Sequence, residues 1–334
     1  MGLLQPGNMQ TGQERNWKIT GGKMSIDKLS MRDSFWNRIY DLASKDKNII
    51  LVCADMGAPS LDKFRENLSA QYFNVGIAEH NMLAVAAGLS KEGKNVFTYA
   101  IAPFATSRCH EFTKLNCGLM KIPIKIVGVG AGFGYDDSGP THHTTEDIAI
   151  MRAIPNLEVY CPADSFASQE IAEMTAMSGK PAYIRLDRHI LPIIYDDSED
   201  FNRGFKELKI GKDVCIVSTG NMTHKAMEAS KRYEKKGVEV GVIDIYRLKP
   251  LNPDLTNNLM RYKKLLSLEE HLLDGGLGSI IAETIVDNDL PLKLKRMGLK
   301  DYVYAYGGRR NIQKLCGIDT DSVANCLDSL IENK

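Results

Sequence analysis

Two short segments of the chain combine residue types that can move protons. Glu79 lies in the run Phe73–Asn81, among small and apolar residues at the start of a predicted helix. A carboxyl group buried in such surroundings stays protonated near neutral pH and can donate a hydrogen bond. The run Gly139–His143 ends in two imidazoles, the side chains best suited to proton transfer at neutral pH. Together the two segments predict a catalytic site.

Each segment also has a simpler interpretation. An acidic residue at a helix start usually just complements the helix dipole. The glycine-rich run Gly128–Gly134 suggests a dinucleotide-binding loop, which needs the spacing G-x-G-x-x-G. That spacing would place glycine where Phe133, Tyr135 or Asp137 stands, so this interpretation fails. Two adjacent histidines rarely bind one metal ion and no third ligand follows at helical spacing, so we predict no metal site in this chain.

The elements around these segments decide where they lie. The first half of the chain alternates helical and strand patterns, which is typical of a parallel sheet covered by helices. Helices are predicted over residues 31–43, 78–91, 105–120, 146–153 and 165–178, and strands over residues 48–53, 71–75, 95–101, 123–129, 157–161 and 182–186. Ligands of such sheets bind beyond the carboxyl ends of the strands. Glu79 and His142 each follow a strand, so both should lie at that edge.

A second α/β series follows an interruption. Residues 191–209 break the periodicity with an acidic stretch and are predicted to be an interdomain linker. Strands are then predicted over residues 213–218, 238–245 and 264–269, and helices over 221–236, after 278 and over 319–333. The predicted division is a disordered or tag-derived arm (1–23), a first domain (24–190), the linker (191–209) and a second domain (210–334). The expected fold class is α/β, with two successive domains whose mostly parallel sheets are flanked by helices.

Charge and composition narrow the function classes. Lys+Arg and Asp+Glu are both 42, which argues against a general binder of nucleic acid or membrane surfaces. The seven cysteines are scattered without a C-x-x-C pair, as in a cytoplasmic protein with reduced thiols. No apolar run approaches the roughly 20 residues of a membrane span. We therefore expect a soluble cytoplasmic protein that binds neither nucleic acid nor membranes.

The motifs at Glu79, Gly139–His143 and Arg188, in this order and spacing, resemble the pyrimidine-binding domain of the transketolase family. Residues 31–325 resemble transketolase from its middle domain to its end, and the matching part of deoxyxylulose-phosphate synthase. The second domain contributes the runs 214–220, 248–251 and 269–278, and is expected mainly to dimerise and to support the fold. The resemblance implies thiamine diphosphate as cofactor, bound by Glu79, Phe104, Ile101 and Asp55.

The resemblance also implies a role for each site residue. Glu79 contacts the aminopyrimidine and favours the tautomer that removes the C2 proton of the thiazolium, while His142 hydrogen-bonds or relays protons to the substrate carbonyl oxygen. Arg188 follows a strand end, where its guanidinium fork suits a substrate phosphate. Further substrate contacts are expected from Ser138, Arg32, Ser60 and His143. Arg108 and His110 could also face the site, although a helix surface explains them equally well.

What the chain lacks defines its expected role. The family's diphosphate-binding domain carries a Gly-Asp-Gly run and a pair of asparagines that hold magnesium, and no Gly-Asp-Gly occurs here. The resemblance therefore implies the C-terminal subunit of a split transketolase. An N-terminal subunit holding Mg²⁺ or Ca²⁺ would complete it in an α2β2 heterotetramer, and this chain alone would be inactive. The pair would transfer a two-carbon ketol unit between sugars.

The loop departs from the usual family form at two positions. Ser138 stands where an aspartate that recognises a sugar hydroxyl commonly precedes Gly-Pro-Thr-His, and His143 replaces the common glutamine. An unusual sugar is therefore the expected substrate. Two alternatives stay open. One is a subunit of a pyruvate-decarboxylating enzyme, like the synthase or the β chain of oxo-acid dehydrogenases, and the other is a non-catalytic regulatory partner.

Overall fold

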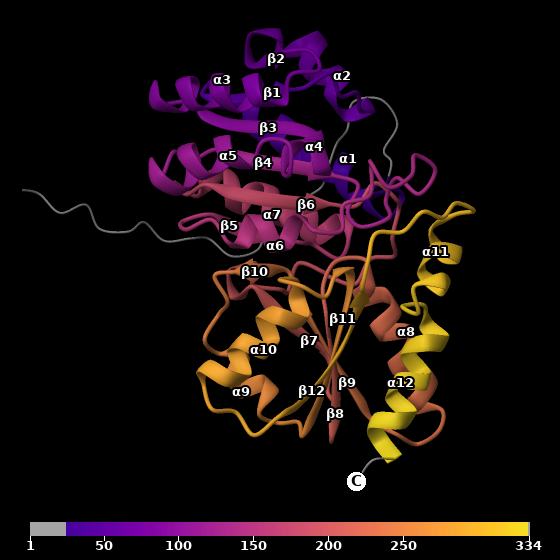
Figure 1. Cartoon of the computed structure of the whole chain (residues 1–334). Helices are drawn as coiled ribbons and strands as arrows, with labels where there is room; N and C mark the ends of the chain where they lie inside the picture. The colour runs from indigo at the N-terminus through magenta and orange to yellow at the C-terminus, as the bar shows by residue number, and fades with distance from the viewer. Residues whose placement is uncertain (1–24, 333–334) are drawn as a thin grey trace, which may run out of the picture.

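The computed structural model describes residues 25–332, so the arm predicted at residues 1–23 lies outside the described part. Two α/β domains follow one another along the chain, and Figure 1 shows the first above the second. Within the described residues, no helix combines the length and apolar character needed to cross a membrane. The prediction of two successive α/β domains is confirmed.

The first domain is built on a seven-stranded sheet in the order β10-β5-β6-β4-β3-β1-β2. Its strands are β1 (Ile49–Cys53), β2 (Tyr72–Asn74), β3 (Asn95–Ile101), β4 (Lys125–Val129), β5 (Glu158–Tyr160), β6 (Ala182–Leu186) and β10 (Arg247–Lys249). All pairs among β1–β6 are parallel, and β10 pairs antiparallel with β5. Every residue of β1, β4 and β6 is buried, because helices cover both faces of the sheet.

Helices divide between the two faces of this sheet. They are α1 (Met31–Ala43), α2 (Pro59–Asn67), α3 (Glu79–Lys91), α4 (Ala102–Ala105), α5 (His110–Thr113), the π-helical turn η3 (Lys114–Leu119), α6 (Asp147–Arg152) and α7 (Ser165–Met177); short 3₁₀ turns η1 (Ile26–Lys28) and η2 (Ser69–Gln71) precede α1 and β2. α1, α2 and α7 share one core cluster around Trp36, whereas α3 and α6 pack into the other around Met82. The sheet is thereby enclosed, and only its edges and strand ends are left for a ligand.

The second domain has a five-stranded sheet in the order β12-β11-β8-β9-β7. Its strands are β7 (Phe205–Lys209), β8 (Val214–Ser218), β9 (Val240–Ile245), β11 (Lys264–Leu272) and β12 (Lys293–Leu299). Its helices are η4 (Phe201–Arg203), α8 (Met222–Glu234), α9 (Leu255–Leu259), α10 (Leu277–Asp287), α11 (Arg309–Leu315) and α12 (Thr320–Glu332). α8 and α12 cover one face and α9 and α10 the other.

Two sequence expectations about local structure are wrong. The segment 191–209, predicted to be a linker, ends in β7, which pairs antiparallel with β9 at the edge of the second sheet. Its sequence hides a strand because only Phe205 is fully buried, while the other positions of this edge strand are partly exposed. The single helix predicted over residues 105–120 is divided into separate pieces. The Thr106 hydroxyl bonds the carbonyl of Ala102, which competes with helical hydrogen bonding where α4 ends.

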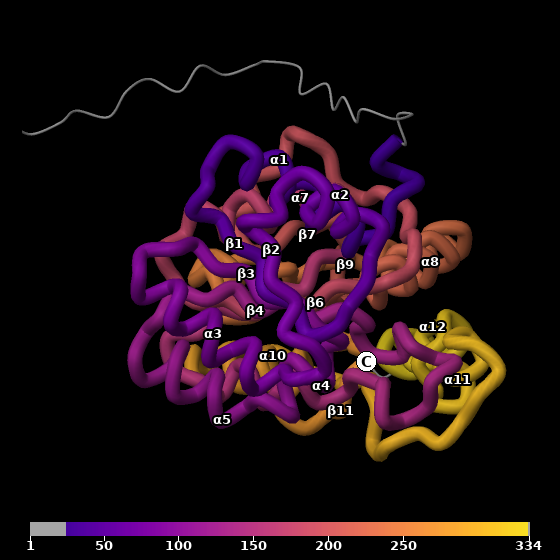
Figure 2. The backbone as a smooth tube through the Cα atoms, turned by 90° about the horizontal axis from the view of Figure 1, so that it is seen from above, coloured from indigo at the N-terminus to yellow at the C-terminus, as the bar shows by residue number. Residues whose placement is uncertain are grey.

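The C-terminal part of the chain returns to the first domain. In Figures 1 and 2 the segment before α11 rises beside loops of the first domain. The backbone N–H of Arg309 donates to Asp136 Oδ2 at 2.6 Å, which fixes this approach. The second domain therefore lies directly against the loop that follows β4.

Candidate active site

Glu79 begins α3 at the carboxyl edge of the first sheet, shortly after β2. It is 3% exposed, and its Oε2 accepts a hydrogen bond from Arg108 Nη1 at 2.8 Å. The Arg108 side chain is 40% exposed, and its guanidinium lies 4.1 Å from the centre of the Phe104 ring. A buried acid is thus connected to the surface through a cation. The expected role of Glu79 as a neutral donor to a cofactor stays a prediction, because its partner in this chain is Arg108.

A continuous series of contacts leads from Phe104 to Arg188. The Phe104 and His142 rings meet edge to face, with centroids 5.2 Å apart. The His142 ring lies 6.2 Å from the ring of Tyr135, and the Arg188 guanidinium lies 4.5 Å from the centre of the same Tyr135 ring. Arg188 Nη1 is also 3.6 Å from Asp137 Oδ1. The residues expected to bind cofactor and substrate therefore share one surface, beyond the ends of β3, β4 and β6.

Arg32 and Ser60 form a small polar cluster with Asp33. Arg32 donates to Asp33 through Nε and Nη2, both at 3.0 Å, and Ser60 Oγ donates to Asp33 Oδ1 at 3.3 Å. Burial raises the pKa of Tyr135, and the positive charges of Arg188 and Arg32 oppose this rise. Both arginines therefore act on the same phenol. This cluster extends the candidate site toward the start of α1.

His143 lies deeper than its neighbour His142. It is 4% exposed and packs edge to face against Phe133, with centroids 5.0 Å apart. Burial lowers its pKa, so the ring is neutral at neutral pH. Neither ring nitrogen has a hydrogen-bond partner among the described residues, which is costly for a buried polar group. Such an unsatisfied ring is suited to a ligand that brings its own hydrogen-bonding groups.

The other expected site residues occupy separate positions. Ile101 ends β3 and is partly buried, and Ser138 is exposed with its hydroxyl donating to Asp137 Oδ1 at 3.2 Å. Asp55 follows β1 in the left-handed conformation, with a φ of 49°, and its N–H donates to Asn74 Oδ1 at 3.0 Å. Asp55 also lies at the carboxyl edge, but no contact within residues 25–332 joins it to the Glu79–Arg188 series. Its expected contact with a cofactor stays a prediction.

Sequence reasoning missed residues that connect this surface. The sequence left Arg108 open, as a residue that could face the site or lie on a helix surface, although it follows Phe104 by four positions. Tyr135, which lies between His142 and Arg188, enters the sequence argument only as a residue that interrupts a glycine pattern. Tyr135 could have been predicted as a site residue from its position after β4, at the edge where ligands of parallel sheets bind. Arg309 gave no signal, because its partners are far away in sequence.

The donor set fits one part of the expected cofactor. A buried carboxyl, an aromatic ring and an unsatisfied imidazole are suited to a heteroaromatic group with ring nitrogens, such as a pyrimidine. A diphosphate with its metal ion needs hard oxygen ligands. Among the described residues, no group of three or more His, Cys, Asp or Glu side chains could hold a metal ion. The donor set of residues 25–332 therefore fits the pyrimidine better than the metal diphosphate.

Comparisons with known proteins match both domains. The family model for the transketolase pyrimidine-binding domain matches residues 27–193, and that for the transketolase C-terminal domain matches residues 205–323. A putative transketolase C-terminal section of Methanocaldococcus jannaschii is 31% identical over 298 residues, which span 88% of this chain and 94% of that protein. An apulose-4-phosphate transketolase subunit of Actinobacillus succinogenes is 34% identical over 276 residues, spanning 82% of this chain and 88% of that protein. A solved structure of a split-gene transketolase, described as an inactive β4 tetramer, superposes with a TM-score of 0.83 at 32% identity and covers 90% of this chain and 98% of that one.

Proposed function

This chain belongs to the transketolase family, and we propose that it supplies the pyrimidine-binding half of a split transketolase whose other half is a separate N-terminal subunit. The resemblance predicted from the motifs is confirmed by the matches to both domains. The cofactor that family membership implies is thiamine diphosphate. In our proposal the N-terminal subunit holds the diphosphate and a Mg²⁺ or Ca²⁺ ion, and two copies of each chain form an α2β2 heterotetramer.

The position of Glu79 carries this proposal. Its carboxyl is buried at the carboxyl edge of the sheet, and the Arg108–Phe104–His142 series connects it to Arg188. When bound, thiamine diphosphate supplies the nucleophilic carbon for transfer of a two-carbon unit. In our proposal Glu79 then holds a proton toward the pyrimidine ring, and Phe104 with Ile101 covers that ring. His142 gives or takes a proton at the substrate oxygen.

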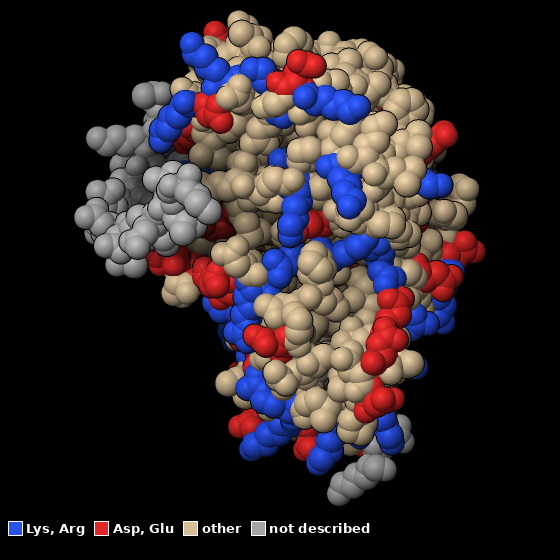
Figure 3. Space-filling model, turned by 90° about the vertical axis from the view of Figure 1, so that its left-hand side faces the viewer, with Lys and Arg blue, Asp and Glu red and all other residues tan. Residues whose placement is uncertain are grey.

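An apolar surface beside Glu79 supports a partner that covers this edge. His80 packs edge to face against Phe112, with centroids 5.2 Å apart, and so holds the segment that leads into η3 beside α3. Ile77 is 79% exposed and Leu119 of η3 is 68% exposed. Figure 3 shows a broad uncharged area on the first domain, whereas charges of both signs crowd the second. A broad exposed apolar area, unlike single exposed apolar side chains, indicates a protein interface, so we propose that the N-terminal subunit docks here.

Arg188 supports a phosphorylated sugar as the substrate. Its contact with Asp137 is long, at 3.6 Å, and Asp137 is largely exposed, so the ion pair is weak and a phosphate can replace it. The exposed hydroxyl of Ser138 stands at the position where the resemblance expects an aspartate. A neutral side chain at this position favours a sugar other than the common pentose phosphates, in line with the substrate in the name of the Actinobacillus relative. Full activity on xylulose 5-phosphate plus ribose 5-phosphate would contradict this choice of substrate.

The thiols support a reducing compartment. All seven cysteines, which lie within the described residues, are free. Burial raises the pKa of both the Cys109 and Cys117 thiols to about 12, which keeps them protonated and unreactive. We propose that the enzyme acts in the cytoplasm, where thiols stay reduced.

The experiment that tests the proposal compares this chain alone with its complex. The chain is co-expressed with a transketolase-like N-terminal subunit from the same organism, and thiamine diphosphate with Mg²⁺ is titrated calorimetrically into both samples. We expect tight binding and ketol transfer only in the complex. Tight binding to the chain alone would contradict a divided site, and binding to neither would contradict the proposed partner.

Substitution of Glu79 then tests the site itself. Glu79→Gln in the complex should lower kcat by about 10²-fold or more, the size of a general acid–base contribution, while cofactor binding persists. The matched control is Glu66→Gln, which changes an exposed glutamate on α2, away from the proposed docking surface. Equal activity of the two variants would remove Glu79 from the mechanism.

A further inference from the structure

Tyr135 lies at the centre of the candidate site, yet the proposed transfer reaction assigns it no role. The Arg188 guanidinium lies 4.5 Å from the centre of its ring, and the His142 ring lies 6.2 Å from the same centre. The positive charges of Arg188 and Arg32 both oppose the rise in the pKa of Tyr135 that burial causes, so Arg32 also lies within electrostatic reach of the phenol. Tyr135 therefore lies near both of the cations that were expected to bind the substrate.

The Tyr135 ring is seated against the backbone of the loop after β4. Gly130 has a φ of 97°, and a Cβ atom at this position would overlap Cδ2 and Cε2 of the Tyr135 ring. Glycine is needed here because the ring lies where a side chain would begin. The Gly130 N–H donates to the carbonyl of Leu186 at 2.9 Å, at the end of the strand that leads to Arg188. One backbone junction therefore places both the phenol and the cation.

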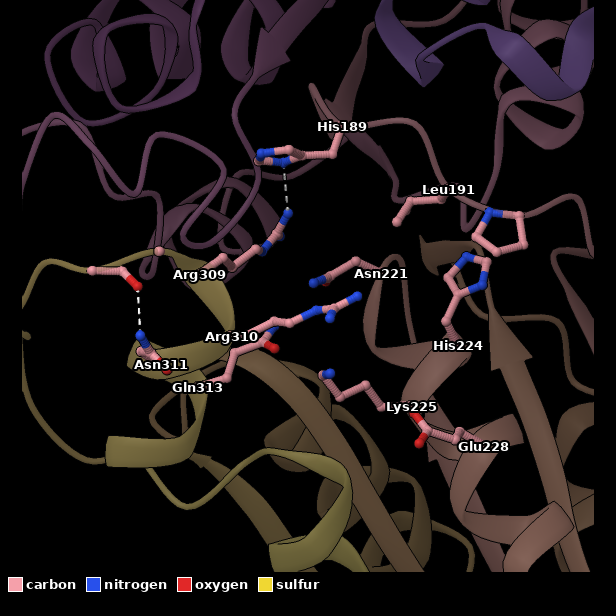
Figure 4. Close-up of a pocket in the computed structure, with 13 residues that line it drawn as sticks. His189, Leu191, Asn221, His224, Lys225, Glu228, Arg309, Arg310, Asn311 and Gln313 are labelled. Atoms are coloured by element: carbon pink, nitrogen blue, oxygen red, sulfur yellow. Dashed lines mark hydrogen bonds between the residues drawn. The ribbon is translucent and has the colours of Figure 1, made fainter.

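The segment that carries Arg188 is also held from the second domain. Figure 4 shows the His189 ring directed at Arg309, with 3.3 Å between His189 Nδ1 and Arg309 Nη1. The same Nη1 donates to Asp187 Oδ2 at 2.6 Å. Asp187 and His189 flank Arg188, so the backbone is fixed on both sides of the cation while its guanidinium lies over Tyr135. The pair is thus placed before a ligand arrives, which lowers the cost of binding one.

The Tyr135 hydroxyl is available to a ligand. Tyr135 is partly exposed, and its hydroxyl makes no hydrogen bond with any residue between 25 and 332. The hydroxyl of the neighbouring Tyr99 is enclosed by the protein, whereas that of Tyr135 is open to solvent. Because the pKa of Tyr135 is raised, the phenol keeps its proton at neutral pH and can donate a hydrogen bond.

We propose that the Tyr135 hydroxyl donates a hydrogen bond to the substrate phosphate beside Arg188, and so makes Tyr135 a specificity-determining residue. This inference rests on the proposed function, in which Arg188 binds that phosphate. Arg188 lies near an anion, Asp137, which the phosphate must displace, and over a neutral donor, Tyr135, which can stay in place. A hydrogen bond to an anion is about twice as strong as one between neutral groups. Tyr135 therefore favours a phosphorylated sugar over the same sugar without its phosphate.

Ketol-transfer kinetics of the complex with the N-terminal subunit test this inference. The probes are D-glyceraldehyde 3-phosphate and D-glyceraldehyde as acceptors, which differ only in the phosphate, with hydroxypyruvate as the common ketol donor. Tyr135→Phe removes the hydroxyl and keeps the ring contacts with Arg188 and His142. We expect kcat/KM for the phosphorylated probe to fall about tenfold or more, mainly through KM, because one hydrogen bond to an anion is lost. The value for D-glyceraldehyde should change less than about twofold, and inorganic phosphate should inhibit the variant more weakly.

Two further variants serve as controls, and thermal unfolding shows that each variant is folded. Tyr304→Phe changes an 85% exposed tyrosine of the second domain and should match the unaltered complex on both probes. Tyr135→Leu removes the ring as well and should lose at least as much as Tyr135→Phe. An unchanged preference for the phosphorylated probe in Tyr135→Phe would overturn the inference, as would an equal loss on both probes or a loss confined to Tyr135→Leu. Absence of ketol transfer by the unaltered complex would instead contradict the proposed function itself.

Discussion

Arg309 is the side chain whose removal should most affect the connection between the domains. Its Nη1 donates to Asp187 Oδ2 at 2.6 Å, its Nη2 to Glu270 Oε2 at 2.5 Å and to the Ala131 carbonyl at 3.0 Å. The Arg309 side chain is largely buried, and both carboxylates are inaccessible. The change Arg309→Met keeps an apolar stem of similar length and removes only the cation. Two buried carboxylates are then left without their positive partner.

The size of the expected loss of unfolding free energy depends on the hydrogen-bond donors that each carboxylate retains. Glu270 retains donors in the Phe133 N–H at 3.0 Å and Gln313 Nε2 at 2.6 Å, whereas Asp187 retains only His189 among the described residues. Breaking a buried ion pair by removing one partner costs about 3–5 kcal/mol of unfolding free energy. We expect a loss in this range, carried mainly by Asp187. The control Arg310→Met changes the exposed, unpartnered neighbour and should cost less than about 0.5 kcal/mol.

The pH dependence of the stability loss gives a second, independent measure of the contact between Arg309 and Asp187. Burial alone would raise the pKa of Asp187, but the charge of Arg309 and the hydrogen bonds from His189 hold it well below its usual range. Asp187 therefore stabilises the fold fully at pH values above its unfolded pKa of about 3.9, and this contribution is lost progressively as the pH falls from that value toward the lower pKa of the folded state. In Arg309→Met this contribution is absent. The difference in unfolding free energy between the two proteins should therefore stay nearly constant from about pH 7 to about pH 4 and shrink as the pH falls further, toward about 2.

Urea denaturation followed by circular dichroism, at several pH values, measures both effects. A loss below about 1 kcal/mol at pH 7 would show that the contacts of Arg309 contribute little net stability. A difference that stays constant as the pH falls from about 4 to about 2 would refute the assignment of the loss to Asp187. Each result is compared with Arg310→Met at the same pH.

Two further predictions concern single side chains. In the proposed complex, Arg188→Ala should raise KM for a phosphorylated sugar at least tenfold with a smaller change in kcat, because Arg188 contacts a part of the substrate that does not react. Steady-state kinetics measure both constants. An unchanged KM would remove Arg188 from the site. Burial raises the pKa of Asp244 to about 7 although the hydroxyls of Thr223 and Tyr195 donate to it. The unaltered chain should therefore lose stability relative to Asp244→Asn as the pH rises from about 4 to 7, by up to a few kcal/mol. Thermal unfolding of both proteins across this pH range measures the effect. Parallel curves of stability against pH for the two proteins would refute the raised pKa of Asp244.

The fold could be predicted where one local pattern dominated. The strand β3 and the helix α1 have the bounds that the sequence predicted, because continuous apolar runs and a helical period left no competing choice. Strand β10 could not be predicted, because Arg247–Lys249 is short and two of its three residues are charged. Its pairing with β5 of the other domain is a tertiary contact without a local signal. Helix α2 was missed for a related reason, since its polar residues obscure the buried Leu61 and Phe64.

The candidate site could be predicted to the extent that its residues follow strands of one parallel sheet. Glu79, Phe104, His142 and Arg188 all come soon after a strand, and parallel strands bring their carboxyl ends to one edge. The contacts that join them depend on side-chain directions in loops, which no sequence period determines. Arg108 turns back onto both Glu79 and Phe104 only because α4 ends at Thr106 and the chain changes direction there. Their roles in catalysis stay predictions until the proposed complex is assayed.

The second domain contributes more to the site region than its sequence suggested. Its motifs predicted mainly dimerisation and support of the fold, yet Arg309 of that domain binds Asp187 beside Arg188, and Glu270 accepts a hydrogen bond from the Phe133 N–H in the loop after β4. Asp187, which Arg309 binds, directly precedes Arg188, and Asp136, which accepts the Arg309 N–H, directly precedes Asp137. A displacement of α11 would therefore move both partners of the Arg188–Asp137 pair. We therefore infer that the position of Arg188, which we propose binds the substrate, depends on a contact between residues that are more than one hundred positions apart in the chain.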